Sequence, residues 1–128
     1  MNGDILTSID FRAMLDFHRE HSGDMTVAVQ QYDVWIPYGV ITTSGVDAVR
    51  IVEKPTLRNF VNTGIYLIQP DACQTVPRDC PYDMQDLITS LISAPKRGVC
   101  FPIREYWLDI SHIEQYQRAA TDVAEGAV

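Results

Sequence analysis

Residues 52–66, V-E-K-P-T-L-R-N-F-V-N-T-G-I-Y, contain the end of one predicted strand, a short polar segment and most of a second predicted strand. Val49 to Glu53 alternate apolar and polar side chains, which is typical of a half-buried strand. Pro55 ends this strand, because proline has no backbone N–H for a sheet ladder. Residues 60–68 are rich in β-branched and aromatic side chains and predict a buried strand. Gly64, in its interior, indicates a bulge or a place where a ligand approaches the backbone.

The polar side chains of this stretch would gather where the paired strands end. Glu53 and Asn62 can hold hydroxyl groups of a ligand, and Lys54 can hold a phosphate as a point charge. This combination suits a ligand that carries both hydroxyl groups and a phosphate. These residues alone favour an ordinary hairpin with a solvated Glu-Lys tip.

Length and composition predict one globular domain in a chain of 128 residues, because 46% hydrophobic and 21% charged residues suffice for a core of ordinary size. The net charge of −7 and the absence of a basic stripe argue against nucleic acid and anionic membrane as partners. The cysteines, Cys73, Cys80 and Cys100, lack C-x-x-C spacing, which favours reduced thiols in a cytoplasmic protein. The first residues have no features of a signal peptide, and no apolar run is long enough to span a membrane.

The rest of the chain alternates predicted strands and helices. A strand end is expected at residues 1–6, followed by a helix that Thr7 or Ser8 caps and Gly23 ends. The apolar face of that helix contains Phe11, Met14, Leu15 and His18, and His18 is most simply a packed histidine.

Further strands are expected at 25–29 and 98–103, and residues 105–110 form a tight apolar segment closed by an acid. A hairpin pairs 38–43 with 46–53 around Ser44-Gly45. Further helical segments are expected at 70–73, from 84 to about 92 after a cap at Asp83, and at 113–124. The predicted class is α/β with a mixed sheet.

Six short motifs occur together in this chain: N-G-D at 2–4, Y-G-V at 38–40, V-E-K-P at 52–55, N-T-G-I-Y at 62–66, Y-D-M-Q-D-L-I at 82–88 and Y-W-L-D-I at 106–110. In order and approximate spacing they resemble the sugar-phosphate nucleotidyltransferase family, which includes mannose-1-phosphate guanylyltransferases and glucose-1-phosphate thymidylyltransferases. The run F-P-I-R-E-Y-W-L-D-I at 101–110 most resembles a bacterial branch often linked to CBS domains. The resemblance implies a Rossmann-like mixed sheet of the nucleotide-diphospho-sugar transferase type.

The resemblance also implies a magnesium site. Asp4 of N-G-D and Asp109 of W-L-D would hold Mg²⁺, which neutralises triphosphate charge while the sugar phosphate attacks in line. Asp4 follows the turn pair Asn-Gly and could instead be a loop acid or a cap, and Asp109 could cap the last helix.

The sugar-binding roles that the resemblance implies fall on the central motifs. Lys54 would contact the sugar 1-phosphate and help to align the nucleophile, which makes it a catalytic residue together with Asp4 and Asp109. The expected substrate-binding residues are Gly39, Glu53, Lys54, Asn62, Thr63, Gly64 and Tyr66. Tyr66 and Trp107 could instead be ordinary core aromatics.

Two departures from the family pattern stand out. Ser111 follows W-L-D-I, where the family usually has glycine, and a serine there would be strained if the backbone needs positive φ. The family's G-G-x-G-T-R loop and P-K-P segment, which hold the triphosphate, are absent from the 128 residues.

We therefore expect residues 1–128 to form one partial domain, the sugar-phosphate-binding half of a nucleotidyltransferase that lacks its N-terminal nucleotide-binding strands. The parent reaction joins a nucleoside triphosphate and a sugar 1-phosphate to an NDP-sugar and pyrophosphate. The isolated chain is expected to be inactive and to form homo-oligomers through an exposed sheet edge. The alternatives are a non-catalytic sugar-phosphate-binding or regulatory subunit whose partner supplies the nucleotide loop, and an inactive gene remnant. The sequence does not specify the sugar or the base.

Overall fold

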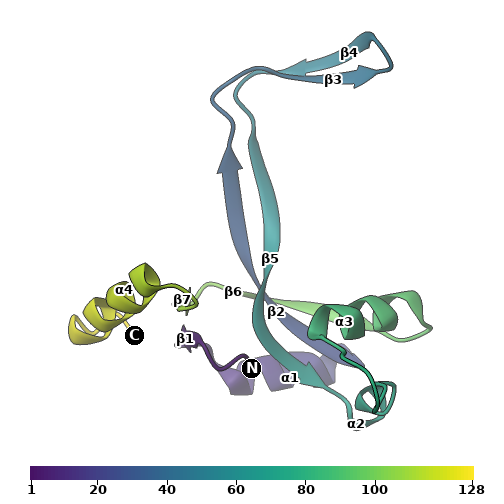
Figure 1. Ribbon diagram of the computed structural model, residues 1–128, viewed down its shortest axis with the longest axis vertical. Coiled ribbons are helices and arrows are strands. Elements are labelled where there is room, and N and C mark those ends of the chain that lie inside the picture. The colour runs from purple at the N-terminus through teal and green to yellow at the C-terminus, as the bar shows by residue number, and fades with distance from the viewer. The chain divides into compact units, whose positions relative to one another are not determined.

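The computed structural model describes residues 1–128 (Figure 1). The chain divides into two compact units, one made of 1–30 with 62–128 and one made of 31–61. The elements in chain order are β1 (Ile5–Thr7), α1 (Phe11–Glu20), β2 (Met25–Trp35), β3 (Val40–Ser44), β4 (Asp47–Val52), β5 (Thr56–Ile68), α2 (Pro70–Cys73), α3 (Met84–Ser93), β6 (Gly98–Ile103), β7 (Trp107–Asp109) and α4 (Ile113–Ala124).

The three-stranded sheet has the order β5-β2-β6, with β6 parallel to β2 from Met25↔Gly98 to Gln30↔Ile103. Two antiparallel pairs, β1 with β7 and β3 with β4, complete the strands. Parallel and antiparallel pairs therefore occur together, and the expected mixed α/β class is confirmed.

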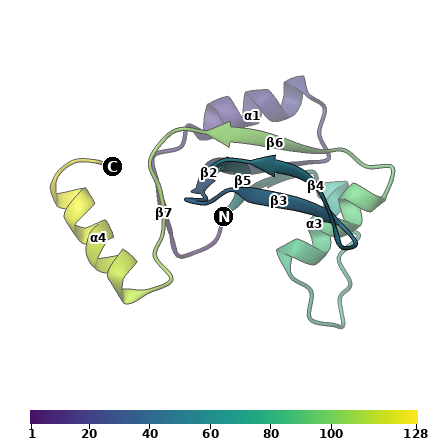
Figure 2. The ribbon, with the colours of Figure 1, turned by 90° about the horizontal axis from the view of Figure 1, so that it is seen from above.

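The sheet of the larger unit is buried on both faces, because successive side chains of β2 point to opposite sides. Met25, Val27 and Val29 pack with residues of α2 and α3, whereas Ala28 packs with Met14 of α1. Figure 2 shows α1 and α3 on opposite sides of β6. Burying a side chain of this size contributes about 1.5–3 kcal/mol, so the two helices hold the sheet from both faces.

The helix boundaries differ from expectation at the first helix. Asp10, not Thr7 or Ser8, caps α1, because its Oδ1 accepts hydrogen bonds from the N–H groups of Arg12 and Ala13. Ser22, with φ 47°, makes the left-handed turn after α1 that was expected at Gly23. Asp83 caps α3 as expected. None of the helices is long and apolar enough to cross a lipid bilayer.

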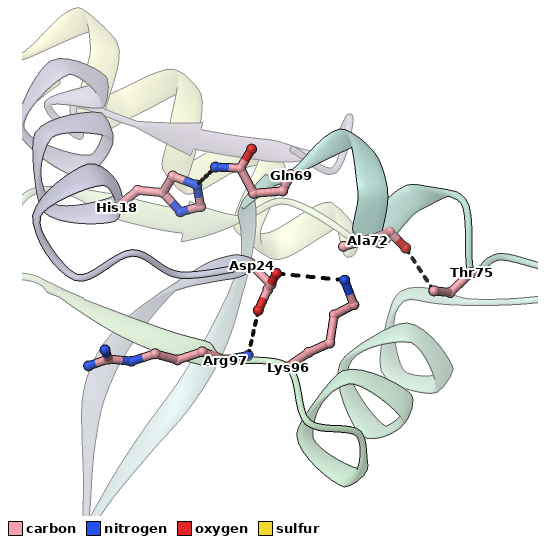
Figure 3. Close-up of polar contacts among 7 residues, drawn as sticks. All are labelled: His18, Asp24, Gln69, Ala72, Thr75, Lys96 and Arg97. Atoms are coloured by element: carbon pink, nitrogen blue, oxygen red, sulfur yellow. Dashed lines mark hydrogen bonds and ion pairs between the residues drawn. The ribbon is translucent and has the colours of Figure 1, made fainter.

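The buried side chain of His18 joins α1 to the sheet, and Figure 3 shows its contact with Gln69. His18 is buried, its Nδ1 lies 2.7 Å from the Thr26 hydroxyl, and its Nε2 lies 2.8 Å from Nε2 of Gln69. Asp24, nearby, accepts a hydrogen bond of 2.7 Å from the N–H of Arg97. The expectation of a packed histidine is confirmed, and both of its ring nitrogens have partners.

The smaller unit is built on the hairpin of β3 and β4. Ile41 pairs with Ile51, and Gly45 makes the turn with φ 59°. The hairpin was expected, but its half-buried character was not borne out, because Val49 and Ile51 are exposed. Phe60, expected in a buried strand, is exposed as well, and the buried part of β5 is Thr63–Ile65.

Candidate functional site

The candidate site residues lie in both units. Gly39, Glu53 and Lys54 belong to the smaller unit, and the larger unit holds the others: Asp4, Asn62, Thr63, Gly64, Tyr66 and Asp109. Each group is therefore described by itself.

The two candidate metal ligands lie side by side. The antiparallel pairing of β1 with β7 sets Ile5 opposite Asp109, and the N–H of Ile110 donates to the backbone carbonyl of Asp4 over 2.8 Å. Asp4 precedes β1 and Asp109 ends β7, so both carboxylates lie at the same end of this pair. The expectation that these residues, distant in sequence, are close in space is confirmed.

Ser111 contacts both carboxylates. Its hydroxyl donates to Oδ1 of Asp109 and also lies 3.4 Å from Oδ2 of Asp4, and its backbone N–H donates to Oδ1 of Asp109 over 3.0 Å. The backbone at Ser111 does not have positive φ. The strain that a serine would suffer in a left-handed conformation therefore does not arise.

Carboxylate oxygens, such as those of this pair, are the type of ligand that Mg²⁺ prefers. The contacts from Ser111 use Oδ1 of Asp109 and Oδ2 of Asp4, which leaves the second oxygen of each group for a cation. Mg²⁺ is commonly held by one or two carboxylates, with waters and substrate phosphates as its other ligands. The structure contains no group of three or more His, Cys, Asp or Glu side chains placed to hold a metal ion.

Tyr106, the residue immediately before β7, anchors α4 to this strand pair. Its hydroxyl donates to Oδ2 of Asp122 over 2.5 Å, and its carbonyl accepts from the Thr7 hydroxyl over 2.7 Å. The hydrogen bond to Asp122 is the main cause that raises the pKa of Tyr106, and partial burial and the Asp122 charge act in the same direction.

A cavity of about 340 Å³ opens beside the carboxylates. It is lined by Asn2, Ile5, Asn62, Thr63, Gly64, Tyr66, Asp83, Met84, Gln85, Trp107 and Asp109. The structure thus brings together the N-T-G-I-Y residues expected to bind sugar and one expected metal ligand.

Sequence reasoning gave no site role to four parts of this lining: Asn2, Ile5, residues 83–85 and Trp107. A signal for three of them was present, because Asn2, residues 83–85 and Trp107 lie in the motifs N-G-D, Y-D-M-Q-D-L-I and Y-W-L-D-I. Trp107, interpreted as a core aromatic, both packs against the core and lines the cavity.

The side-chain amide of Asn62 makes hydrogen bonds to two neighbouring residues of the cavity wall. Its Oδ1 accepts from the N–H of Gly64 over 2.9 Å, and its Nδ2 donates to the hydroxyl of Tyr66 over 2.8 Å. Because the Tyr66 oxygen accepts this bond, its own proton remains available for a ligand. The direct polar contact from this pair is therefore more readily made by Tyr66 than by Asn62.

The buried side chain of Thr63 ties the cavity wall to strand β2. Its side chain is 1% exposed, and its hydroxyl donates to the carbonyl of Ala28 over 2.7 Å. Its carbonyl accepts from Nε1 of Trp107 over 2.8 Å. Any contact of Thr63 with a ligand would have to come from its backbone.

Gly64 has φ 75°, and the group closest to it is the side chain of Asn2. A Cβ at position 64 would lie 2.7 Å from Nδ2 of Asn2, and the N–H of Asn2 donates to the Gly64 carbonyl over 2.9 Å. The close approach expected from a glycine within a strand thus involves another part of the chain. It joins the N-G-D loop to the N-T-G-I-Y strand.

In the smaller unit, the Y-G-V and V-E-K-P motifs lie together at the open end of the hairpin. A Cβ on Gly39 would lie 3.2 Å from Oε2 of Glu53, and the N–H of Lys54 donates to the carbonyl of Tyr38 over 3.2 Å. Lys54 has φ 43°, although it precedes Pro55. Strained non-glycine residues of this kind persist where the surroundings fix them, and they cluster at functional sites.

Known proteins share both sequence and fold with this chain. The family model "Nucleotidyl transferase" matches residues 1–126. The chain is 30% identical over 118 residues to the "Putative mannose-1-phosphate guanyltransferase" of Sulfolobus acidocaldarius and 28% identical over 122 residues to mannose-1-phosphate guanylyltransferase 1 of Arabidopsis thaliana. These alignments cover 91% of this chain but 32% and 33% of the relatives. The chain thus spans about a third of the length of the curated relatives it matches.

Two solved structures show the same fold. HddC from Yersinia pseudotuberculosis has a TM-score of 0.64 at 20% identity, covering 96% of this chain and 53% of that one. The "Putative Glucose-1-Phosphate Thymidylyltransferase" from Bacillus anthracis, in complex with sucrose, has a TM-score of 0.63 at 19% identity, covering 93% of this chain and 51% of that one. With the family match over almost its whole length, the chain belongs to the nucleotidyl transferase family.

Proposed function

We propose that residues 1–128 form one domain, the sugar-phosphate-binding part of a nucleotidyltransferase. The parent reaction would be nucleoside triphosphate plus sugar 1-phosphate giving NDP-sugar plus pyrophosphate. The observation that carries this proposal is the cavity of about 340 Å³, whose wall contains the N-T-G-I-Y residues and Asp109, with Asp4 beside Asp109. The names of the curated relatives favour a hexose 1-phosphate such as mannose 1-phosphate as the first ligand to test.

The proposed mechanism relies on position and charge. In the reaction, an oxygen of the sugar 1-phosphate attacks the α-phosphorus of the triphosphate, and pyrophosphate leaves from the opposite side. Asp4 and Asp109 would hold Mg²⁺, which when bound neutralises phosphate charge. Lys54 would hold the attacking phosphate as a point charge, and its left-handed backbone fixes where its side chain begins.

Each unit contains candidate contacts for a sugar. Tyr66 can donate its hydroxyl proton to a sugar oxygen, since Asn62 already donates to the Tyr66 oxygen. Glu53 would accept from sugar hydroxyls, and Gly39 would offer its backbone, because a side chain at position 39 would crowd the Glu53 carboxylate.

The 128-residue polypeptide tested alone should not make NDP-sugars, since it contains no G-G-x-G-T-R sequence. Each preorganised donor on the triphosphate contributes about 10²–10³ in rate, and that loop supplies several. A non-catalytic or regulatory subunit with the same cavity is the alternative. Pyrophosphate release that appears only after addition of a chain bearing the loop would favour this alternative, and turnover by the 128-residue chain alone would contradict the expected inactivity.

We also infer a cytoplasmic location and self-association. Cys73, Cys80 and Cys100 are all free and exposed, which suits a reducing compartment. β1 pairs with β7 on one edge, and its other edge is the proposed site of pairing with a second copy. Sedimentation that yields a monomer at high protein concentration would contradict the association.

Sugar binding can be tested by NMR titration of the ¹⁵N-labelled chain with mannose, glucose and glucosamine 1-phosphates. We expect millimolar affinity, about −4 kcal/mol, and shifts in residues 38–40 and 53–66. The matched variant is Tyr66→Phe, which removes only the hydroxyl and should weaken binding, and the unphosphorylated sugar is the ligand control. Shifts that avoid both segments would refute the pocket assignment.

A further inference from the structure

Ser111 stands between two acids that come from opposite ends of the sequence. Asp4 precedes β1, Asp109 ends β7, and Ser111 lies in the short connection from β7 to α4. The Ser111 hydroxyl contacts Oδ1 of Asp109 and lies 3.4 Å from Oδ2 of Asp4. It is the only uncharged side-chain donor that the hydrogen bonds of this structure place on both carboxylates.

The backbone alone does not fix the two carboxylates relative to each other. The β1–β7 pairing and the bond from the Ile110 N–H set the two main chains, but Asp4 and Asp109 are exposed and their side chains can rotate. Two carboxylates of like charge also repel each other when no cation lies between them. The single proton of the Ser111 hydroxyl can go to only one acid at a time, but either acid can accept it, and this opposes their separation.

Ser111 is itself held in place. Its backbone N–H donates to Oδ1 of Asp109 over 3.0 Å, and the connection needs no left-handed residue at this position. The hydroxyl therefore starts from a fixed point beside Asp109 and reaches toward Asp4. Its contacts occupy one oxygen of each acid and leave the other oxygen open.

We propose that Ser111 is a positioning residue of the divalent-cation site, whose hydroxyl holds Asp4 and Asp109 side by side before the cation binds. The inference rests on the proposed function, which assigns this pair of acids to Mg²⁺. Holding the pair in advance lowers the loss of side-chain freedom on binding, so the cation binds more tightly. The hydroxyl need not become a ligand.

The test measures Mn²⁺ alone as a paramagnetic substitute for Mg²⁺, with free Mn²⁺ followed by EPR on the full chain. Ser111→Ala should weaken binding about three- to tenfold, the worth of one net hydrogen bond. Ser111→Thr keeps the hydroxyl and should bind within about twofold of the original chain. Ser8→Ala removes an exposed hydroxyl outside the pair and should leave the affinity unchanged.

NMR line broadening by Mn²⁺ supplies a second measurement that a purely structural role would not change. In the original chain the amides next to Asp4 and Asp109 should broaden together at each Mn²⁺ concentration. In Ser111→Ala, at equal occupancy, the two sets should broaden unequally, because the acids no longer act as a pair.

The outcomes separate this inference from the proposed function. Loss of Mn²⁺ binding in Asp109→Asn, together with weaker binding in Ser111→Ala and recovery in Ser111→Thr, supports both. Loss in Asp109→Asn with unchanged or tighter binding in Ser111→Ala overturns the role of Ser111 and retains the cation site. Binding that Asp109→Asn leaves unchanged overturns the cation site and the inference with it.

Discussion

Replacing Gly64 by alanine should destabilise the chain by about 1.5–3.5 kcal/mol. Two costs add up at this position. Gly64 has φ 75°, and a left-handed backbone costs a residue with a Cβ about 1–2 kcal/mol. The new Cβ would also lie 2.7 Å from Nδ2 and 3.0 Å from Cγ of Asn2, so the exposed Asn2 side chain must leave its position, at about 0.5–1.5 kcal/mol.

Equilibrium unfolding in urea measures this loss, and the chain offers a matched control. Gly126 has φ 71° and nothing within 4 Å of a Cβ added there, so Gly126→Ala reports the left-handed cost without the contact. In the double variant Asn2→Ala/Gly64→Ala, the clashing amide is gone, and about 0.5–1.5 kcal/mol should return. A Gly64→Ala loss no larger than that of Gly126→Ala, or no recovery in the double variant, would refute the assigned contact.

Further predictions concern three other side chains. In alkaline solution the original chain should lose more stability than Tyr106→Phe. The bond to Asp122 raises the pKa of Tyr106, so the contribution of this bond to the free energy of unfolding is complete below the usual pKa near 10 and disappears as the pH rises through the raised value. Unfolding measured between pH 8 and 12 would show this difference. Thr63→Val should lower the free energy of unfolding by about 0.5–1.5 kcal/mol through loss of the bond to the Ala28 carbonyl, and Thr63→Ser, which keeps the hydroxyl, should retain that bond in the NMR spectrum. Asp83→Ala should destabilise α3 by about 0.5–2 kcal/mol, detected as faster amide hydrogen exchange in its first turn.

Local sequence signals predicted the elements whose boundaries are set locally. The strand at 98–103 and the helix at 113–124 have the expected bounds, and Asp83 caps α3 with its own carboxylate. The cap of α1 was missed because Thr7 is engaged elsewhere. Its hydroxyl donates to the carbonyl of Tyr106, a partner 99 positions away that no local pattern reveals.

Some features of the candidate site were likewise predictable from the sequence, and others were not. The resemblance to the nucleotidyltransferase family implied that Asp4 and Asp109 would be close, and the pairing of β1 with β7 bears this out. The contact of Asn2 with Gly64 and the contacts of Ser111 depend on side chains that meet only after folding. The left-handed backbone of Lys54 also escaped prediction, since a residue before proline usually takes an extended conformation.

The pairing of β1 with β7 has a consequence for the order of events in folding. Asp4 and Ser111 are 107 positions apart, so their meeting closes almost the whole chain into a loop, and loop-closure entropy rises with loop length. This pair should therefore form late, after the more local hairpin of β3 and β4. A cation bound by Asp4 and Asp109 would then link these two distant parts of the chain only after folding. Its binding should slow unfolding and leave the refolding rate unchanged.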